Sequence, residues 1–339
     1  IWIIVGVVLA GAVQDFVILF GSIRRNGKSL GEMIKEEIGP VTGFIAMVGI
    51  FGIMVILLAV LALVVVKALT DSPWGMFTIA ATIPIAVFMG IYMRYLRPGR
   101  VGEASIIGII LLLLSIYFGQ YVSEHETLAA MFTFTGEQIA IMLIIYGFIA
   151  SVLPVWLLLA PRDYLSTFLK IGTIVGLAIG ILVVAPNLEM PAMTQFVDGT
   201  GPVFSGNLFP FLFITIACGA VSGFHSLISS GTTPKMIERE SHARPIGYGA
   251  MLTESFVAVM AMIAACVLTP GIYFAINSPA AAIGTDPATV ATTVSSWGYT
   301  ITPDDLTTLA DDVGESSVIS RTGGAPTLAI GMAHIFSQV

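Results

Sequence analysis

The sequence has 339 residues, of which 56% are hydrophobic and only 10% are charged, and its formal net charge is −7. Ordinary water-soluble domains are far less apolar, so this composition predicts a membrane protein. The negative charge belongs to the loops and provides no basic surface, which argues against nucleic acid as a partner.

Apolar stretches long enough to cross a membrane as helices recur along the chain, and no alternation typical of membrane strands occurs. We therefore expect an all-α fold, a polytopic bundle of about nine membrane spans in which the last is truncated and at least one helix is broken. The predicted spans are Ile1–Ile23, Val41–Val66, Gly75–Tyr92, Gly102–Val122, Glu137–Leu159, Leu165–Val184, Phe209–Ser230, Gly247–Leu268 and a ninth that begins near Gly324.

The chain begins inside one apolar run and ends inside another. We expect residues 1–339 to be a single transmembrane domain that is an excerpt of a longer protein. Within the sixth span, Gly172, Gly176 and Gly180 recur at every fourth position, which predicts a face where a second helix packs closely.

Most of the 14 Lys and Arg residues lie in every second loop. By the positive-inside rule, the basic loops 24–35, 94–100, 160–164 and 235–244 should face the cytoplasm. The long acidic loop 277–321 should then be extracytoplasmic. Within it, Thr302-Pro303-Asp304-Asp305 has the pattern of a helix start, with a hydroxyl cap, Pro at the first position and carboxylates in the first turn. An ordered cap and a flexible spacer both remain open for this loop.

The seventh span carries an unusual run of polar residues. Its first part, Phe209–Val221, covers only about 20 Å as a helix, so the crossing must continue through the polar run. Such groups at hydrocarbon depth must face protein or water, and broken helices of this kind hold substrates in secondary transporters. The predicted substrate-binding residues are Ser222, Gly223, His225, Ser226, Ser229, Ser230 and Thr232.

A structural alternative exists for the same residues: the hydroxyls could bond to carbonyls of their own helix, and His225 could cap a helix end near the cytoplasmic surface. His225 and Ser226 are adjacent and point about 100° apart on a helix, so they do not form a nucleophile and base pair. We therefore expect no enzyme activity and no catalytic residue.

Two carboxylates also lie within predicted spans, Asp15 in the first and Glu254 in the eighth. Facing lipid would be costly for either, so both should face inward, as a protonated carboxyl beside a polar neighbour or in a proton relay. Asp15, His225 and Glu254 are thus the candidates for proton coupling. Because Cys218 and Cys266 both fall within spans, we expect no metal site and no cofactor, with a proton or sodium as possible coupling ion.

Four long stretches of the sequence resemble the carbon starvation protein A family. They are AGAVQDFVILFGSIRRNGKSLGEMIKEEIGP at 10–40, MGIYMRYLRPGRVGE at 89–103, LPVWLLLAPRDYLSTFLKIGTIVG at 153–176 and FPFLFITIACGAVSGFHSLISSGTTPK at 209–235. The resemblance covers essentially the whole chain, and only the loop around Ala280 to Ala291 differs from what the family leads us to expect.

The resemblance implies a multi-pass secondary transporter of the bacterial inner membrane, related to the amino acid/polyamine/organocation superfamily. It implies import of small peptides during carbon starvation, with pyruvate/proton symport as an alternative. A sensor that detects starvation solutes without moving them is a third possibility. The expected partners are membrane lipid and the solute, either a small peptide or pyruvate, and the oligomeric state is left open.

Overall fold

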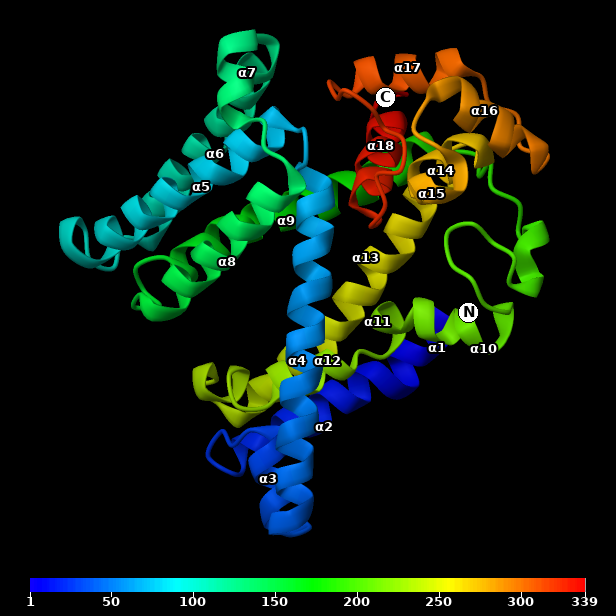
Figure 1. Cartoon of the computed structure of the whole chain (residues 1–339). Coiled ribbons are helices and arrows are strands. Elements are labelled where there is room, and N and C mark those ends of the chain that lie inside the picture. The colour runs from blue at the N-terminus through cyan, green and yellow to red at the C-terminus, as the bar shows by residue number, and fades with distance from the viewer. Residues whose placement is uncertain (339) are drawn as a thin grey trace. The chain divides into compact units, whose positions relative to one another are not determined.

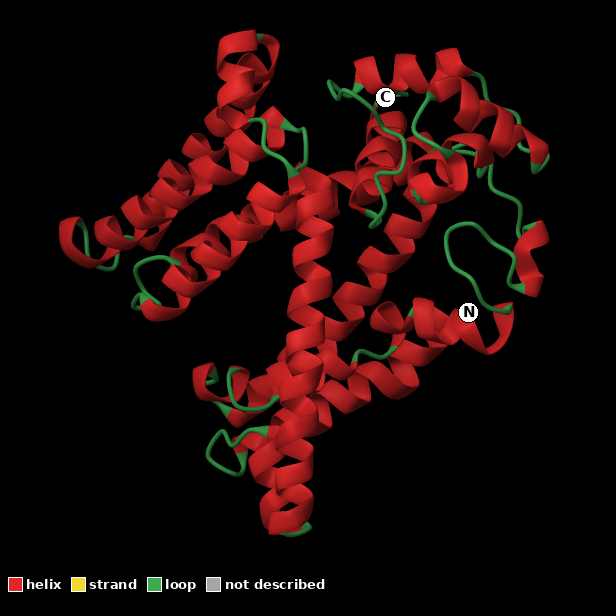
Figure 2. Ribbon diagram, viewed as in Figure 1, coloured by secondary structure: helices red, strands yellow, loops and turns green. Residues whose placement is uncertain are grey.

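The computed structural model describes residues 1–338, and these contain helices and loops but no strand (Figures 1 and 2). The expectation of an all-α fold is therefore confirmed. The chain forms two compact units, one made of residues 1–59 and 190–266 and the other of residues 60–189 and those from 267 onward. A single transmembrane domain stays a prediction.

Six helical stretches in the described part of the chain are long and apolar enough to cross a membrane. They are Trp2–Ile23, Pro40–Leu69, Pro73–Leu96, Val101–Glu124, Leu159–Val184 and Glu240–Cys266. A seventh crossing would be the helix pair Glu126–Phe132 and Gly136–Val152, which is bent by 58°. The structure thus supports six or seven of the nine expected spans and contains a broken helix pair.

The other two expected spans are shorter than a crossing. The residues of the seventh expected span form three short helices, and the ninth corresponds to α18 (Ala325–Phe336), which has only 12 residues. Length and apolar composition alone do not make either of them a span.

The first unit starts with a continuous helical stretch made of α1 (Trp2–Gly6), a π-helical turn η1 (Val7–Gly11) and α2 (Ala12–Ile23). Helix α3 (Leu30–Glu37) follows and begins with a capping box formed by Ser29 and Glu32. Helix α4 (Pro40–Leu69) begins in this unit and continues into the second. The later part of the first unit contains η3 (Gln195–Asp198), α10 (Leu208–Thr215), α11 (Ala217–Ala220), α12 (Gly223–Ser229), η4 (Thr233–Met236), η5 (Glu240–His242), η6 (Arg244–Tyr248) and α13 (Gly249–Cys266).

The second unit contains the remaining helices. They are α5 (Pro73–Ile91), η2 (Tyr92–Leu96), α6 (Val101–Glu124), α7 (Glu126–Phe132), α8 (Gly136–Val152), α9 (Leu159–Val184), α14 (Pro270–Asn277), α15 (Ala280–Ile283), α16 (Pro287–Ser296), α17 (Pro303–Asp312) and α18. Buried Met89, Leu112 and Leu165 bring α5, α6 and α9 together in one apolar cluster. At Gly180 on α9, an added Cβ would lie 2.8 Å from the Phe336 ring of α18, so the expected close helix contact forms at this glycine. It does not extend to Gly172, where an added Cβ has no neighbour within 4 Å among the described residues.

The acidic loop 277–321 contains ordered helices. Helix α17 starts at the predicted position, with Pro303 in its first turn and a capping box between Thr302 and Asp305. The hydrogen bonds from Thr302 lower the pKa of the Asp305 carboxyl below its ordinary value. The predicted helix start is therefore confirmed. The hydroxyl cap, the proline and the carboxylates all favour the same first turn.

Candidate functional site

The polar run of the seventh expected span lies on a helix that is interrupted twice. Helix α10 ends at Thr215 beside the β-branched Ile216, and α11 ends at Ala220. Val221 and Ser222 are then extended, with φ/ψ of −151°/108° and −102°/117°, before α12 begins at Gly223. Glycine and β-branched residues have low helix propensity, so this sequence forms a continuous helix less readily than its neighbours.

The interruption is bridged by a side chain of the first helical stretch. Gln14 on α2 donates through Nε2 to the backbone oxygen of Ser222 at 2.8 Å and to Oγ of Ser226 at 2.9 Å. The carbonyl of Ser222, the N-cap residue of α12, thus accepts a hydrogen bond from outside its own helix. The amide of Gln14 therefore holds the extended segment and the first turn of α12 together.

The same two segments approach each other closely at a glycine. A Cβ at Gly11 would collide with the backbone oxygen of Ala220 in α11. Gly11 is also the last residue of the π-helical turn η1, a distortion that often occurs at functional sites. The chain thus needs glycine here, where the first helical stretch meets the broken segment.

Three of the predicted ionisable residues come together beside this contact. His225 on α12 contacts Asp15 on α2 through Nδ1 and Oδ2 at 2.8 Å, and it contacts Glu254 on α13 through Nε2 and Oε2 at 2.9 Å. With both carboxylates ionised, both contacts are hydrogen bonds only when both ring nitrogens carry protons. The imidazole therefore bridges two carboxylates from two different membrane-length helices.

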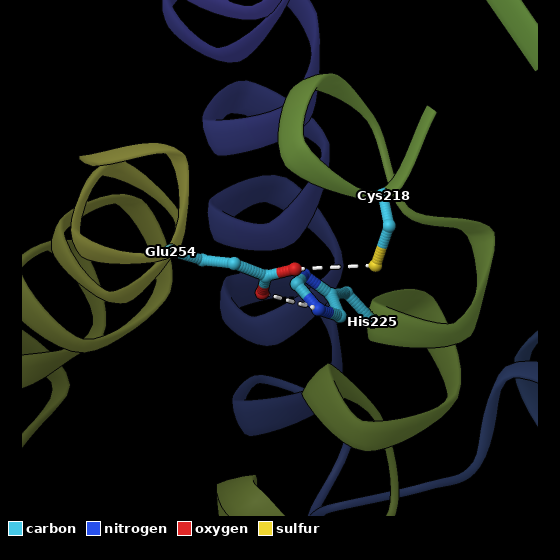
Figure 3. Close-up of side chains that lie close together, drawn as sticks. All are labelled: Cys218, His225 and Glu254. Carbon is cyan, nitrogen blue, oxygen red and sulfur yellow. Dashed lines mark hydrogen bonds and ion pairs between the residues drawn. The ribbon is translucent and has the colours of Figure 1, made fainter. Parts of the chain in front are cut away.

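A fourth residue, Cys218 on α11, completes the cluster, and its Sγ donates to Oε1 of Glu254 at 3.2 Å. Figure 3 shows the side chains of Cys218, His225 and Glu254 pointing toward one another. Asp15 is only 4% exposed, and its Oδ1 has no hydrogen-bond partner among residues 1–338. We call Asp15, Cys218, His225 and Glu254 the histidine cluster.

The remaining predicted residues divide between two places. Ser222 and Ser226 are buried against Gln14, whereas Ser229 and Ser230 are buried at the far end of α12. Ser230 donates through Oγ to the backbone oxygen of Ser226 at 2.8 Å and accepts from the amide of Leu30 at 3.1 Å. The bond within α12 fits the structural alternative for this hydroxyl.

Gly223 and Thr232 are exposed, and Thr232 precedes the short helix η4. A cavity of about 340 Å³ lies at this end of the polar run. It is lined by Ser29, Leu30, Gly31, Met47, Ile50, Phe51, Met54, Leu227 and Ser230. The predicted residues therefore do not surround one pocket, and the histidine cluster and this cavity are separate features.

Sequence reasoning did not group Cys218 with the other three residues. Cys218 lies seven positions before His225, and two residues seven apart share one face of a continuous helix. That spacing is the sequence signal that could have linked Cys218 to His225. The donor atoms of Cys218, His225 and Glu254 all lie within 4.8 Å of one another, so these three residues could hold a metal ion.

The chain matches the family described as Carbon starvation protein CstA over residues 1–339. It belongs to this family. It is 65% identical to the peptide transporter CstA of Campylobacter jejuni over 340 residues, covering 100% of this chain and 48% of that protein. It is 66% identical to the peptide transporter CstA of Escherichia coli over 340 residues, covering 99% of this chain and 48% of that protein.

Another similar protein is named for a different solute. The pyruvate/proton symporter BtsT of Escherichia coli is 60% identical over 361 residues, covering 100% of this chain and 50% of that protein. These names are those of transporters, so the CstA family is one of transporters and not of enzymes. The chain spans about half the length of the curated relatives it matches. No solved structure matches it significantly.

Proposed function

We propose that this chain is part of a secondary active transporter of the bacterial inner membrane that imports small peptides under carbon starvation, coupled to protons. Membership of the CstA family and the names of its relatives support the transport class. The observation that carries the proposal is the part-buried contact of Asp15 with His225 and, through it, with Glu254. Ionisable groups on membrane-length helices are costly in lipid and are typical of substrate and ion pathways.

The alternative solute is pyruvate. The relative named as a pyruvate/proton symporter is 60% identical, close to the 65% and 66% of two relatives named as peptide transporters. Peptides and pyruvate both present a carboxylate, which the same hydrogen-bond donors could bind. Only a comparison of the two solutes in one assay separates these functions.

Alternating access would centre on the broken helix. We propose the finer architecture expected from the sequence, a single domain with about nine spans related to the amino acid/polyamine/organocation superfamily, in which the seventh crosses as a broken helix. The freed backbone between α11 and α12 and the hydroxyls of Ser222 and Ser226 would contact the solute. The basic loops would face the cytoplasm and loop 277–321 the other side.

Two groups of residues would then have different roles. Solute binding would involve the residues of the polar run, which are Ser222, Gly223, His225, Ser226, Ser229, Ser230 and Thr232. Ion coupling would involve Asp15, His225 and Glu254, because His225 bridges both carboxylates. A proton is the proposed coupling ion, with sodium as the alternative.

The test is uptake of labelled dipeptide and labelled pyruvate by the full-length protein in proteoliposomes, with and without an imposed proton gradient. We expect accumulation driven by the proton gradient in the parent and its loss in Asp15→Asn and His225→Ala. Asp198→Asn is the matched control, because Asp198 accepts hydrogen bonds from the nearby Thr200 and lies outside the polar run. Its uptake should equal that of the parent.

Each other outcome has a meaning. Unchanged, proton-driven uptake in both Asp15→Asn and His225→Ala would exclude the histidine cluster from transport. Solute binding without accumulation would indicate a sensor instead of a transporter. Accumulation that requires a sodium gradient would replace the proton by sodium as coupling ion.

A further inference from the structure

The donor atoms in the histidine cluster are arranged closely enough for one metal ion. Nε2 of His225 lies 2.9 Å from Oε2 of Glu254, and Sγ of Cys218 lies 3.2 Å from Oε1 of the same carboxylate. Zinc–ligand bonds of about 2.0 to 2.3 Å in a tetrahedral arrangement separate donor atoms by roughly 3.3 to 3.7 Å. Small side-chain movements that open the two hydrogen bonds by a few tenths of an ångström, and that draw together donor atoms now within 4.8 Å of one another, would therefore make room for the ion.

Asp15 supplies the outer partner that a metal-binding histidine needs. Its Oδ2 lies 2.8 Å from Nδ1 of His225, the ring nitrogen opposite the one that faces Glu254 and Cys218. A histidine ligand almost always donates its other N–H to a carboxylate or carbonyl, which fixes the tautomer and turns the free nitrogen toward the metal. Asp15 is only 4% exposed, so this carboxylate lies within the packing.

The three donor residues are also accessible, whereas their outer partner is buried. Cys218 is exposed, and the side chains of Glu254 and His225 are 36% and 20% exposed. Three protein ligands leave a fourth coordination position open, as in zinc sites that bind a further small molecule. The arrangement is therefore not a closed structural site.

The types of donor indicate which metal fits. Calcium and magnesium take oxygen ligands, and only one of these three residues offers oxygen. A thiolate, an imidazole and a carboxylate together suit zinc and similar divalent transition metals.

We propose that Cys218, His225 and Glu254 form a binding site for a divalent transition metal ion of the zinc type, with Asp15 as the residue that positions His225. Binding releases the proton of the Cys218 thiol and the proton on Nε2 of His225, and the metal forms bonds to both atoms and to a Glu254 oxygen. The inference goes beyond the proposed transport function and does not depend on it. If His225 also carries a coupling ion, the metal and that ion compete for Nε2.

The test uses the full-length protein, purified in detergent, stripped with a chelator and titrated with Co²⁺ as a spectroscopic substitute for Zn²⁺. We expect one Co²⁺ per chain at this site, with a thiolate-to-cobalt charge-transfer band that Zn²⁺ abolishes on displacement. Cys218→Ser should remove the band. Cys266→Ser is the matched control, since Cys266 is the other free cysteine of the chain, and it should keep the band unchanged.

The positioning role of Asp15 has its own readout. Asp15→Asn should weaken Co²⁺ binding by roughly 10- to 100-fold while it retains the charge-transfer band, because loss of an outer carboxylate weakens the site without removing a ligand. Gel filtration and thermal unfolding of each metal-free variant show that it is folded.

A parent protein without a thiolate–cobalt band would overturn the proposal, as would a band that persists in Cys218→Ser. Metal binding is measured with no solute or gradient present. A negative result here therefore leaves the uptake experiment unaffected, and a negative uptake result leaves the metal site unaffected.

Discussion

Asp15 and His225 are 210 positions apart in the sequence, and Oδ2 of the first lies 2.8 Å from Nδ1 of the second. A charge-assisted hydrogen bond contributes about 1.5 to 3 kcal/mol. Asp15→Asn and His225→Ala should therefore be non-additive, with a coupling of about 0.5 to 3 kcal/mol in a double-mutant cycle read by unfolding in detergent.

The control for this cycle pairs His225→Ala with Asp198→Asn. The Asp198 carboxylate accepts from Thr200 two residues away and belongs to a local turn. These two changes should add within about 0.5 kcal/mol. Full additivity of the Asp15 and His225 changes would contradict the contact.

Replacing Gln14 by methionine should destabilise the protein. Methionine has a similar volume but cannot donate to the backbone oxygen of Ser222 or to Oγ of Ser226. A buried acceptor left without its donor costs about 1 to 3 kcal/mol, so the midpoint of thermal unfolding should fall. Gln120→Met is the comparison, because Gln120 bonds only to exposed Glu124, and its effect should stay within about 0.5 kcal/mol.

Gly11→Ala should be destabilising even though alanine is the better helix former. The new methyl group would collide with the backbone oxygen of Ala220, and overpacking of this kind costs about 1 to 3 kcal/mol. At Gly249 no atom lies within 4 Å of an added Cβ, so Gly249→Ala should be neutral or stabilising by up to about 1 kcal/mol. Equal unfolding midpoints for the two variants would show that the close approach at Gly11 does not exist.

The capping box of α17 should make this helix sensitive to acid. Hydrogen bonds from Thr302 lower the pKa of Asp305 below its ordinary 3.8, so the folded state favours the ionised carboxylate. The stabilisation is then fully present above the ordinary pKa and is lost as the pH falls through the lowered one. Amide-exchange protection of Pro303–Asp312, corrected for intrinsic rates, should decline over this acidic window.

Two variants separate this effect from general acid unfolding. Asp305→Asn should remove the acid-dependent part of the protection, because the amide does not titrate there. Asp304→Asn, which changes the neighbouring carboxylate outside the capping box, should retain it. The same acid dependence in both variants would assign it to another group.

The sequence predicted those features that depend on neighbouring residues. The apolar runs predicted helices throughout, and the Thr302-Pro303-Asp304-Asp305 pattern predicted the start of α17 at the correct residue. Asp15, His225 and Glu254 were identified because their polarity conflicts with membrane-length apolar segments. Each of these inferences needs only local sequence and the properties of lipid.

The contacts between distant segments could not be predicted in the same way. The spacing of Cys218 and His225 is a local signal, but nothing local indicates that α2 and α13 bring Asp15 and Glu254 to them. That meeting depends on contacts between distant segments, such as the close approach of Gly11 to Ala220. The two interruptions before Gly223 were also not located individually. Whether the extended segment before Gly223 is held depends on a distant side chain, Gln14, which bonds to Ser222 and Ser226.

The bridge from Gln14 to Ser222 and Ser226 has a mechanical consequence. Sliding the first helical stretch by one residue, about 1.5 Å, would displace the Gln14 amide by about half the 2.8 and 2.9 Å lengths of its two hydrogen bonds. The stretch Trp2–Ile23 and the turn that starts α12 should thus travel together as one rigid piece. Any rocking motion that opens a binding site first to one side of the membrane and then to the other would need its pivots outside these two segments.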